Sequence, residues 1–138
     1  MKKQVLFLCT GNSCRSHMAE GMTNHFLGEN WQAYSAGTEP TGYVHPLAIE
    51  AMAEMGMSLN GHTSKSVTRF REHSFDLVIT VCDSAAETCP IWLGSGNVKH
   101  ISFPDPAHAV GSHEEKMSVF RQVRDDMRQQ LLPYLKSQ

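Results

Sequence analysis

The fold of this chain is decided by one stretch near its start, Val5-Leu6-Phe7-Leu8-Cys9-Thr10-Gly11-Asn12-Ser13-Cys14-Arg15-Ser16. Its first four residues form a continuous apolar run, which predicts a strand buried on both faces of a parallel sheet. A helical pattern follows the loop, with Met18, Met22 and Phe26 spaced i, i+4, i+8 on a face expected in the core and Gly28 placed to end the helix. The stretch therefore predicts a strand, a loop and the start of a helix.

Strand and helix patterns alternate along the rest of the chain. Residues 31–36, 77–81 and 98–102 predict three more strands. We expect a helix from Pro46 to near Gly56, a short helix around Val67 and Phe70, and a long final helix that ends at Pro133. The apolar face of that last helix comprises Met117, Phe120, Val123, Met127 and Leu131. We therefore predict one domain over residues 1–138, a three-layer αβα fold with about four parallel strands.

Composition narrows the function classes. The 138 residues carry a formal charge of −2 with a pI near 6.4, which argues against a nucleic-acid or polybasic membrane protein. No apolar run approaches the roughly 18–20 residues of a membrane span, and the run 5–8 is too short for a signal-peptide core. We expect a cytoplasmic monomer whose four cysteines are reduced, so that any disulfide is catalytic. His108 and His113 have a finger-like spacing, but without a Cys-x2-Cys no metal site is predicted.

The loop between the first strand and the first helix has the position of a ligand site. In doubly wound folds, ligands bind beyond the carboxyl end of a strand, where N–H groups and the helix dipole favour an anion. The loop is not a Walker A sequence; it begins with Cys9 and has Arg15 six residues later, suited to bidentate capture of a tetrahedral oxyanion. The positive environment also favours the thiolate form of Cys9. We predict an oxyanion site made by Thr10, Gly11, Asn12, Ser13, Cys14 and Arg15.

A simpler interpretation is that Cys9 only packs at the end of a buried strand. That interpretation leaves Gly11, Asn12, Ser13 and Arg15 without a role, so we prefer the anion site. For the Cys14 side chain the preference is reversed, and packing is expected.

The motif Cys9-Thr-Gly-Asn-Ser-Cys-Arg-Ser16, followed by Met18-Ala-Glu-Gly21, resembles the opening of thioredoxin-coupled arsenate reductases, which share a fold and anion loop with low-molecular-weight protein tyrosine phosphatases. The likeness continues over nearly the whole chain, through Tyr34-Ser-Ala-Gly37, His62-Thr-Ser64, Cys82 to Cys89-Pro90, Asp105-Pro106 and Phe120-Arg-Gln-Val-Arg-Asp125. The resemblance implies the phosphatase-like fold and a reaction on arsenate, with thioredoxin as the reductant.

By this resemblance, Cys9 is the nucleophile, Arg15 clamps the oxyanion, Ser16 stabilises the thiolate and Asp105 is the general acid. From the residues alone, an ordinary turn aspartate is the better interpretation of Asp105, and it is the resemblance that favours the general acid. The phosphatases typically have an aromatic residue after the Asp-Pro pair, where this chain has Ala107. A phosphatase remains the alternative function, and it would give Cys82 and Cys89 no catalytic role. A third alternative, an arsenite- or zinc-binding sensor, would leave Arg15 without a role.

The resemblance also implies a relay in which Cys82 attacks Cys9 and Cys89 then attacks Cys82. Residues 83–88 are expected to form a short capped helix. A helix from Cys82 to Cys89 would hold their Cα atoms about 10.5 Å apart, beyond the roughly 4.4–6.8 Å of a disulfide. We therefore expect this segment to unwind on oxidation.

Two positions depart from the pattern of related enzymes. Those enzymes often bind potassium with ligands that correspond to Asn12, Glu20, Ser35, Thr63 and an aspartate where this chain has Lys65. The Lys65 ammonium is expected either to take the place of the ion and pair with Glu20 or to lie solvated at the surface. No cofactor is therefore predicted. The other departure, His17, has no consequence that the sequence reveals.

Overall fold

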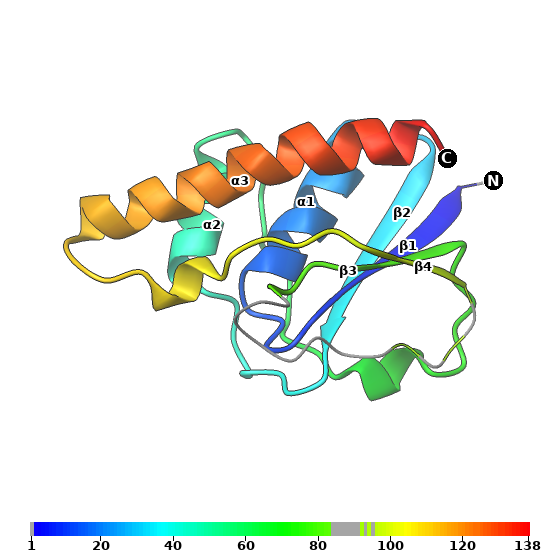
Figure 1. Ribbon diagram of the computed structural model, residues 1–138. Helices are drawn as coiled ribbons and strands as arrows, with labels where there is room; N and C mark the ends of the chain where they lie inside the picture. The colour runs from blue at the N-terminus through cyan, green and yellow to red at the C-terminus, as the bar shows by residue number, and fades with distance from the viewer. Residues whose placement is uncertain (1, 84–91, 93, 95) are drawn as a thin grey trace.

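The computed structural model describes residues 2–83, 92, 94 and 96–138 and contains a four-stranded, all-parallel sheet in the order β2-β1-β3-β4 (Figure 1). The strands are β1 (Lys3–Cys9), β2 (Trp31–Gly37), β3 (Leu77–Thr80) and β4 (Asn97–His100). The helices are α1 (Arg15–Leu27), α2 (Pro46–Ala53) and α3 (His113–Lys136), with 3₁₀ turns η1 (Val67–Phe70) and η2 (Pro106–His108). The predicted α/β class and four parallel strands are confirmed.

The sheet is covered on both faces, which gives three layers (Figure 1). Val5, Phe7 and Ile79 face the core shared with α1, α2 and α3. Leu6, Leu8 and other side chains of the opposite face pack under η1 and the segment after it, where Phe70 and Phe75 are buried. Alternate residues of β1 thus enter two different cores, because successive side chains of a strand point to opposite faces. This explains the unbroken apolar run 5–8, whose four side chains are 0% exposed.

Two expectations from the apolar pattern were wrong. The helix α3 does not end at Pro133 but continues to Lys136. Proline removes one helical hydrogen bond, but the last turn is retained because Leu135 is 0% exposed in the core. Phe26 was placed with Met18 and Met22 on the buried face of α1; the two methionines are buried, whereas Phe26 lies at the surface under the guanidinium of Arg128.

The other elements follow the sequence patterns closely. Pro46 is the first residue of α2, and Gly56 follows with a φ of 75°, a left-handed conformation suited to glycine. The fourth strand, expected at residues 98–102, is an exposed edge strand over Asn97–His100. In the part of the chain that the structure describes, no helix combines the length and apolarity needed to span a membrane. The short helix expected within residues 83–88 falls almost entirely outside the described residues.

Candidate active site

The predicted anion loop lies at the carboxyl end of β1 and runs into the first turn of α1 (Figure 1). The end of β2 lies directly against it, because Cys9 pairs with Gly37 in the parallel register. A Cβ atom at Gly37 would lie 2.4 Å from the carbonyl oxygen of Thr10 and 3.0 Å from the backbone nitrogen of Asn12. Only glycine therefore allows the strand to approach the loop this closely.

The carbonyl groups of the loop are hydrogen-bonded to partners outside it. The Thr10, Gly11 and Ser13 oxygens accept from the backbone N–H groups of Glu39, Thr41 and His45, at 2.9, 3.0 and 2.8 Å. The Asn12 oxygen contacts Nε2 of His17 at 3.0 Å. In a trans peptide the C=O and the following N–H point in opposite directions, so the N–H groups of residues 11–14 face the inside of the loop. This arrangement suits a bound anion.

Cys9 Sγ lies among hydrogen-bond donors. The backbone N–H of Asn12 donates to it at 3.2 Å, and Ser16 Oγ lies 3.0 Å away. The Asn12 side-chain amide donates to Ser16 Oγ at 2.7 Å, so the hydroxyl proton of Ser16 is left to point at the sulfur. Both contacts to Sγ then stabilise negative charge on it. This is the geometry expected of a nucleophilic thiolate.

Arg15 joins the loop to the predicted general acid. Its side chain is buried, donates from Nη1 to the Phe103 carbonyl at 3.2 Å, and places Nη2 3.5 Å from Asp105 Oδ2. Asp105 is the N-cap of η2, where Oδ1 accepts from the Ala107 N–H at 3.0 Å. The Asp105-Pro106 turn thus orients the carboxylate toward the arginine that would hold the oxyanion. His108 Nε2 adds a contact to Asp105 Oδ2 at 3.4 Å from the solvent side.

The two loop thiols have different surroundings. Cys14 was expected only to pack; it is indeed buried, but its S–H also donates to Asp105 Oδ1 at 3.3 Å. Burial, together with the Asp105 charge, raises the pKa of Cys14 to about 12, so it stays a neutral thiol near pH 7. Cys14 is therefore a poor nucleophile near neutral pH.

Cys82 lies two residues beyond the end of β3, the strand that neighbours β1 on the other side from β2. It is 0% exposed and takes part in a disulfide bond, whereas Cys9 and Cys14 are free thiols. Because Leu8 pairs with Thr80, Cys9 and Cys82 leave the sheet at the same edge. Cys89, and with it the predicted change of shape of the 82–89 segment, lies outside the described residues.

The Lys65 ammonium lies behind the loop and not at the open surface. Its Nζ donates to the Thr63 carbonyl at 2.8 Å and to Ser35 Oγ at 3.4 Å, and lies 4.0 Å from Glu20 Oε1. Burial lowers the pKa of Lys65, and the Glu20 carboxylate opposes this shift. Glu20, Ser35 and the Thr63 carbonyl are thus all in contact with the lysine ammonium.

One group of side chains in the described part of the molecule has the composition of a metal site. His17, Glu20 and His62 each bring a ligand atom within 4.8 Å of the others. Their atoms are already engaged with one another, with His17 Nδ1 and His62 Nδ1 3.1 Å apart and His62 Nε2 3.6 Å from Glu20 Oε2. Because the Lys65 ammonium already faces Glu20, a second cation here would be repelled.

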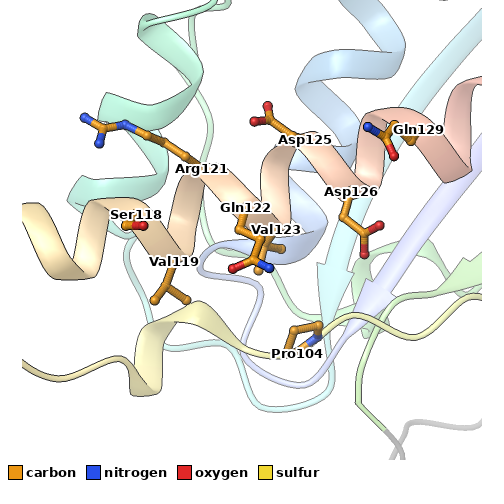
Figure 2. A pocket seen from close by; sticks show the side chains of 9 residues that line it. All are labelled: Pro104, Ser118, Val119, Arg121, Gln122, Val123, Asp125, Asp126 and Gln129. Carbon is orange, nitrogen blue, oxygen red and sulfur yellow. The ribbon is translucent and has the colours of Figure 1, made fainter.

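The loop is not part of the broad hollow drawn in Figure 2. That hollow, of about 750 Å³, lies along α3 and is lined by Pro104, Ser118, Val119, Arg121, Gln122, Val123, Asp125, Asp126 and Gln129. None of these is a predicted site residue. The candidate site is instead a cradle of backbone donors, which matches a small tetrahedral anion better than a large organic ligand.

Sequence reasoning missed the support behind the loop. It proposed no role for His17, and it did not foresee that Lys65 donates its backbone N–H to Asn12 Oδ1 at 2.7 Å. A histidine in the first turn of a helix gives no signal of this role, because the contacts join residues up to 53 positions apart. The one clue in the sequence is that residue 12 is an asparagine, because asparagine tolerates the left-handed conformation that Asn12 adopts in the structure, with a φ of 47°.

Comparison with known proteins identifies the family of this chain. Residues 4–137 match the family described as low molecular weight phosphotyrosine protein phosphatase, and the chain belongs to that family. In this chain a Cys-x5-Arg loop lies between the central parallel strand β1 and the helix α1.

Within that family the chain belongs with the arsenate reductases. It is 47% identical to the arsenate reductase of Halalkalibacterium halodurans over 126 aligned residues, and the alignment covers 91% of this chain and 90% of that protein. It is 44% identical over 125 residues to the arsenate reductase of Bacillus subtilis, covering 91% and 89%. A solved arsenate reductase in the phosphate binding state superposes with a TM-score of 0.75 at 28% identity, covering 98% of both chains.

Proposed function

We propose that this protein reduces arsenate to arsenite with the thiols of Cys9, Cys82 and Cys89. The observation that carries the proposal is the combination of an anion loop around Cys9 with a second cysteine, Cys82, at the same sheet edge. Sequence relatives that cover nine-tenths of the chain and bear the name arsenate reductase support it. Reduction of As(V) to As(III) needs two electrons, which two thiolates supply when they become a disulfide.

In the first step the Cys9 thiolate attacks arsenic in the loop. An S–As bond forms, an As–O bond breaks, and Asp105 donates a proton so that water leaves. Arg15 holds the remaining oxygens, and the inward N–H groups of the loop stabilise their charge. The contact of Arg15 Nη2 with Asp105 Oδ2, at 3.5 Å, supports these two roles, because it brings both side chains to one place.

In the second step the Cys82 thiolate attacks Cys9 Sγ. An S–S bond forms, the S–As bond breaks, and its electron pair stays on arsenic, which leaves as arsenite. Cys89 then attacks Cys82, which releases Cys9 as a thiolate and leaves a Cys82–Cys89 disulfide. A free Cys9 beside a disulfide-bonded Cys82, as the structure shows, is the state expected after this last exchange.

Thioredoxin is the proposed reductant of that disulfide. The protein gains a disulfide in each cycle and must lose it through exchange with an external dithiol. The resemblance to thioredoxin-coupled enzymes names thioredoxin, and a cytoplasmic setting supplies it in reduced form.

The test is arsenite production by the wild type, Cys82→Ser and Cys89→Ser with a thioredoxin system. We expect turnover only in the wild type, and a loss of two thiols per arsenate when the reductant is omitted. Sustained turnover by Cys82→Ser would exclude the relay. A phosphatase would lose no thiols, and a sensor that only binds metal would recover its thiols on chelation.

A tyrosine phosphatase is the weaker alternative. It uses the same loop and needs no further thiol, but the residue after Asp105-Pro106 is Ala107, with no aromatic ring to stack on a substrate tyrosine. Hydrolysis of p-nitrophenyl phosphate that exceeds arsenate reduction would favour it.

We also propose that the protein works without potassium. The Lys65 ammonium supplies a positive charge to Glu20, Ser35 and the Thr63 carbonyl, where related enzymes bind the ion. A salt bridge within the protein is present at every potassium concentration. Equal activity and melting temperature in sodium and potassium buffers is the expected result, and clear stimulation by potassium would contradict the proposal.

A further inference from the structure

We propose that His17 is a positioning residue for Cys9: its ring holds Asn12 in the conformation that aims two of the Asn12 donors at Cys9 and Ser16. The inference rests on Cys9 being the nucleophile of the proposed function. It adds a role for a buried side chain that touches neither the sulfur nor the anion.

Asn12 supplies two of the hydrogen-bond donors around the Cys9–Ser16 pair. Its φ of 47° is left-handed, a conformation that few non-glycine residues adopt and that neighbouring contacts hold in place here. The backbone N–H donates to Cys9 Sγ at 3.2 Å and the side-chain amide to Ser16 Oγ at 2.7 Å. If Asn12 relaxed toward an ordinary conformation, both donors would turn away from the Cys9–Ser16 pair.

Two contacts from outside the loop hold Asn12 in place. The Lys65 backbone N–H fixes the side-chain oxygen at 2.7 Å, and His17 Nε2 lies 3.0 Å from the backbone oxygen. All four polar atoms of Asn12 are therefore hydrogen-bonded, and the residue is 0% exposed. Removal of the His17 donor would leave a buried carbonyl without its partner, which is costly.

The neighbours of the His17 ring determine which of its two nitrogens carries the proton. A carbonyl oxygen only accepts, so Nε2 of His17 carries the proton that bonds Asn12. His17 Nδ1 is then an acceptor, and His62 Nδ1 donates to it at 3.1 Å. The Ser35 hydroxyl lies 3.4 Å from the same nitrogen but donates to Glu20 instead. The ring is thus held at both nitrogens.

His17 acts as a neutral donor. It is 0% exposed, and burial, followed by the electrostatic influence of Lys65 and His62, lowers its pKa to about 3. The Glu20 carboxylate, the one negative group described in this cluster, contacts His62 and Lys65. At neutral pH the hydrogen bond to Asn12 therefore remains in one tautomer.

The test compares two substitutions that both supply an amide donor but differ in the length of the side chain. In His17→Gln the amide nitrogen is as many bonds from Cα as Nε2, so it can still donate to the Asn12 carbonyl. In His17→Asn the amide nitrogen takes the place of Nδ1 and cannot reach. The readout is the rate of Cys9 alkylation by iodoacetamide as a function of pH, measured on the disulfide-bonded form. There Cys82 is blocked and Cys14, with its pKa raised to about 12, is unreactive.

We expect His17→Asn to raise the pH midpoint of Cys9 alkylation by about half to one unit and to slow alkylation at pH 7 about three- to tenfold, the range of one hydrogen bond. His17→Gln should restore most of the wild-type profile. His62→Ala, which removes the donor to His17 Nδ1, should shift the midpoint in the same direction by less. The matched control is His113→Asn, a surface histidine 3.0 Å from Glu50, which should leave the profile unchanged.

Equal effects of the Gln and Asn substitutions would overturn the proposal, because a merely structural histidine does not distinguish donor reach. A wild-type profile in His17→Asn would also overturn it. Should His17→Asn fail to fold, a profile of His62→Ala identical to that of the wild type is the result that contradicts it. Failure of the proposed function itself is seen separately, as absent arsenite production by a wild type with a normal Cys9 profile.

Discussion

Replacing Cys89 by serine is expected to stop the relay at a Cys9–Cys82 disulfide. Serine cannot attack Cys82, so one equivalent of arsenate added to the reduced variant should be released as arsenite while the two sulfurs remain joined. The variant keeps three of the four cysteines, and the free-thiol count should fall from three to one, leaving Cys14. Cys14 should survive because its raised pKa keeps it protonated.

The register of the sheet allows this disulfide. Leu8 pairs with Thr80, and the Val81 N–H continues the ladder to the Leu8 oxygen at 3.0 Å, so Cys9 is level with Val81 and Cys82 lies one residue further. With strands about 4.8 Å apart and a rise of about 3.3 Å, the Cα atoms of Cys9 and Cys82 are about 6 Å apart. A disulfide needs roughly 4.4–6.8 Å.

The direction of the Cys82 side chain is the remaining requirement. In a regular strand Cys82 would point to the opposite face from Cys9, since successive side chains alternate. The chain bends at Cys82, where it leaves the sheet, and this bend is the place at which its sulfur can turn toward Cys9.

The assay is thiol titration followed by peptide mass mapping of the alkylated, non-reduced protein. The control is the Cys82→Ser/Cys89→Ser double variant, which should form no disulfide and release no arsenite. Recovery of Cys82 as an alkylated thiol after arsenate treatment, or a Cys9–Cys14 disulfide in its place, would refute the reasoning from sheet register.

Four further outcomes are expected. Lys65→Asp should make activity depend on potassium, because it replaces the ammonium by a carboxylate. The measurement is the ratio of rates in potassium and sodium buffers, and an unchanged ratio would contradict the idea that the Lys65 ammonium takes the place of the ion. His17 binds a proton more readily in the unfolded than in the folded protein, so protonation should lower the free energy of unfolding as pH falls from about 6.5 toward 3, by at most about 3 kcal/mol at pH 4. Urea unfolding at pH 7 and at pH 4 should therefore show a smaller loss of stability between the two pH values for His17→Gln than for the wild type. Gly37→Ala should abolish arsenate turnover and weaken phosphate binding, measured by calorimetry, because its Cβ would meet the Thr10 oxygen at 2.4 Å. Leu135→Ala should cost about 2–5 kcal/mol in urea unfolding, which a helix ending at Pro133 would not show.

The fold was predictable where burial is reflected in local pattern. A strand that is buried on both faces must be apolar at every position, and residues 5–8 show this directly. The end of α3 was not predictable in the same way. Proline marks a local preference, whereas the extra turn depends on Leu135 reaching a core formed by distant segments.

The site shows the same division. The loop, with Cys9 at its start and Arg15 at the helix, was predictable because its residues are consecutive and follow a buried strand. The partners of these residues were not. Cys14 meets Asp105 across 91 positions, and His17 meets His62 across 45, and no periodicity encodes either contact. The family resemblance supplied the general-acid role of Asp105, but not its hydrogen bond with Cys14.

The different chemistry of Cys9 and Cys14 follows from those distant contacts. Both are buried cysteines of one loop, five positions apart, and burial alone disfavours a thiolate at each. Cys14 is turned toward the Asp105 carboxylate, which adds a negative charge to the cost of ionising it. Cys9 is turned toward the Asn12 N–H and the Ser16 hydroxyl, which favour negative charge on sulfur. Which of the two thiols is suited to be the nucleophile therefore depends on the groups that the folded chain places against each sulfur. Under our proposal His17 and Lys65, which contact Asn12, contribute to that difference.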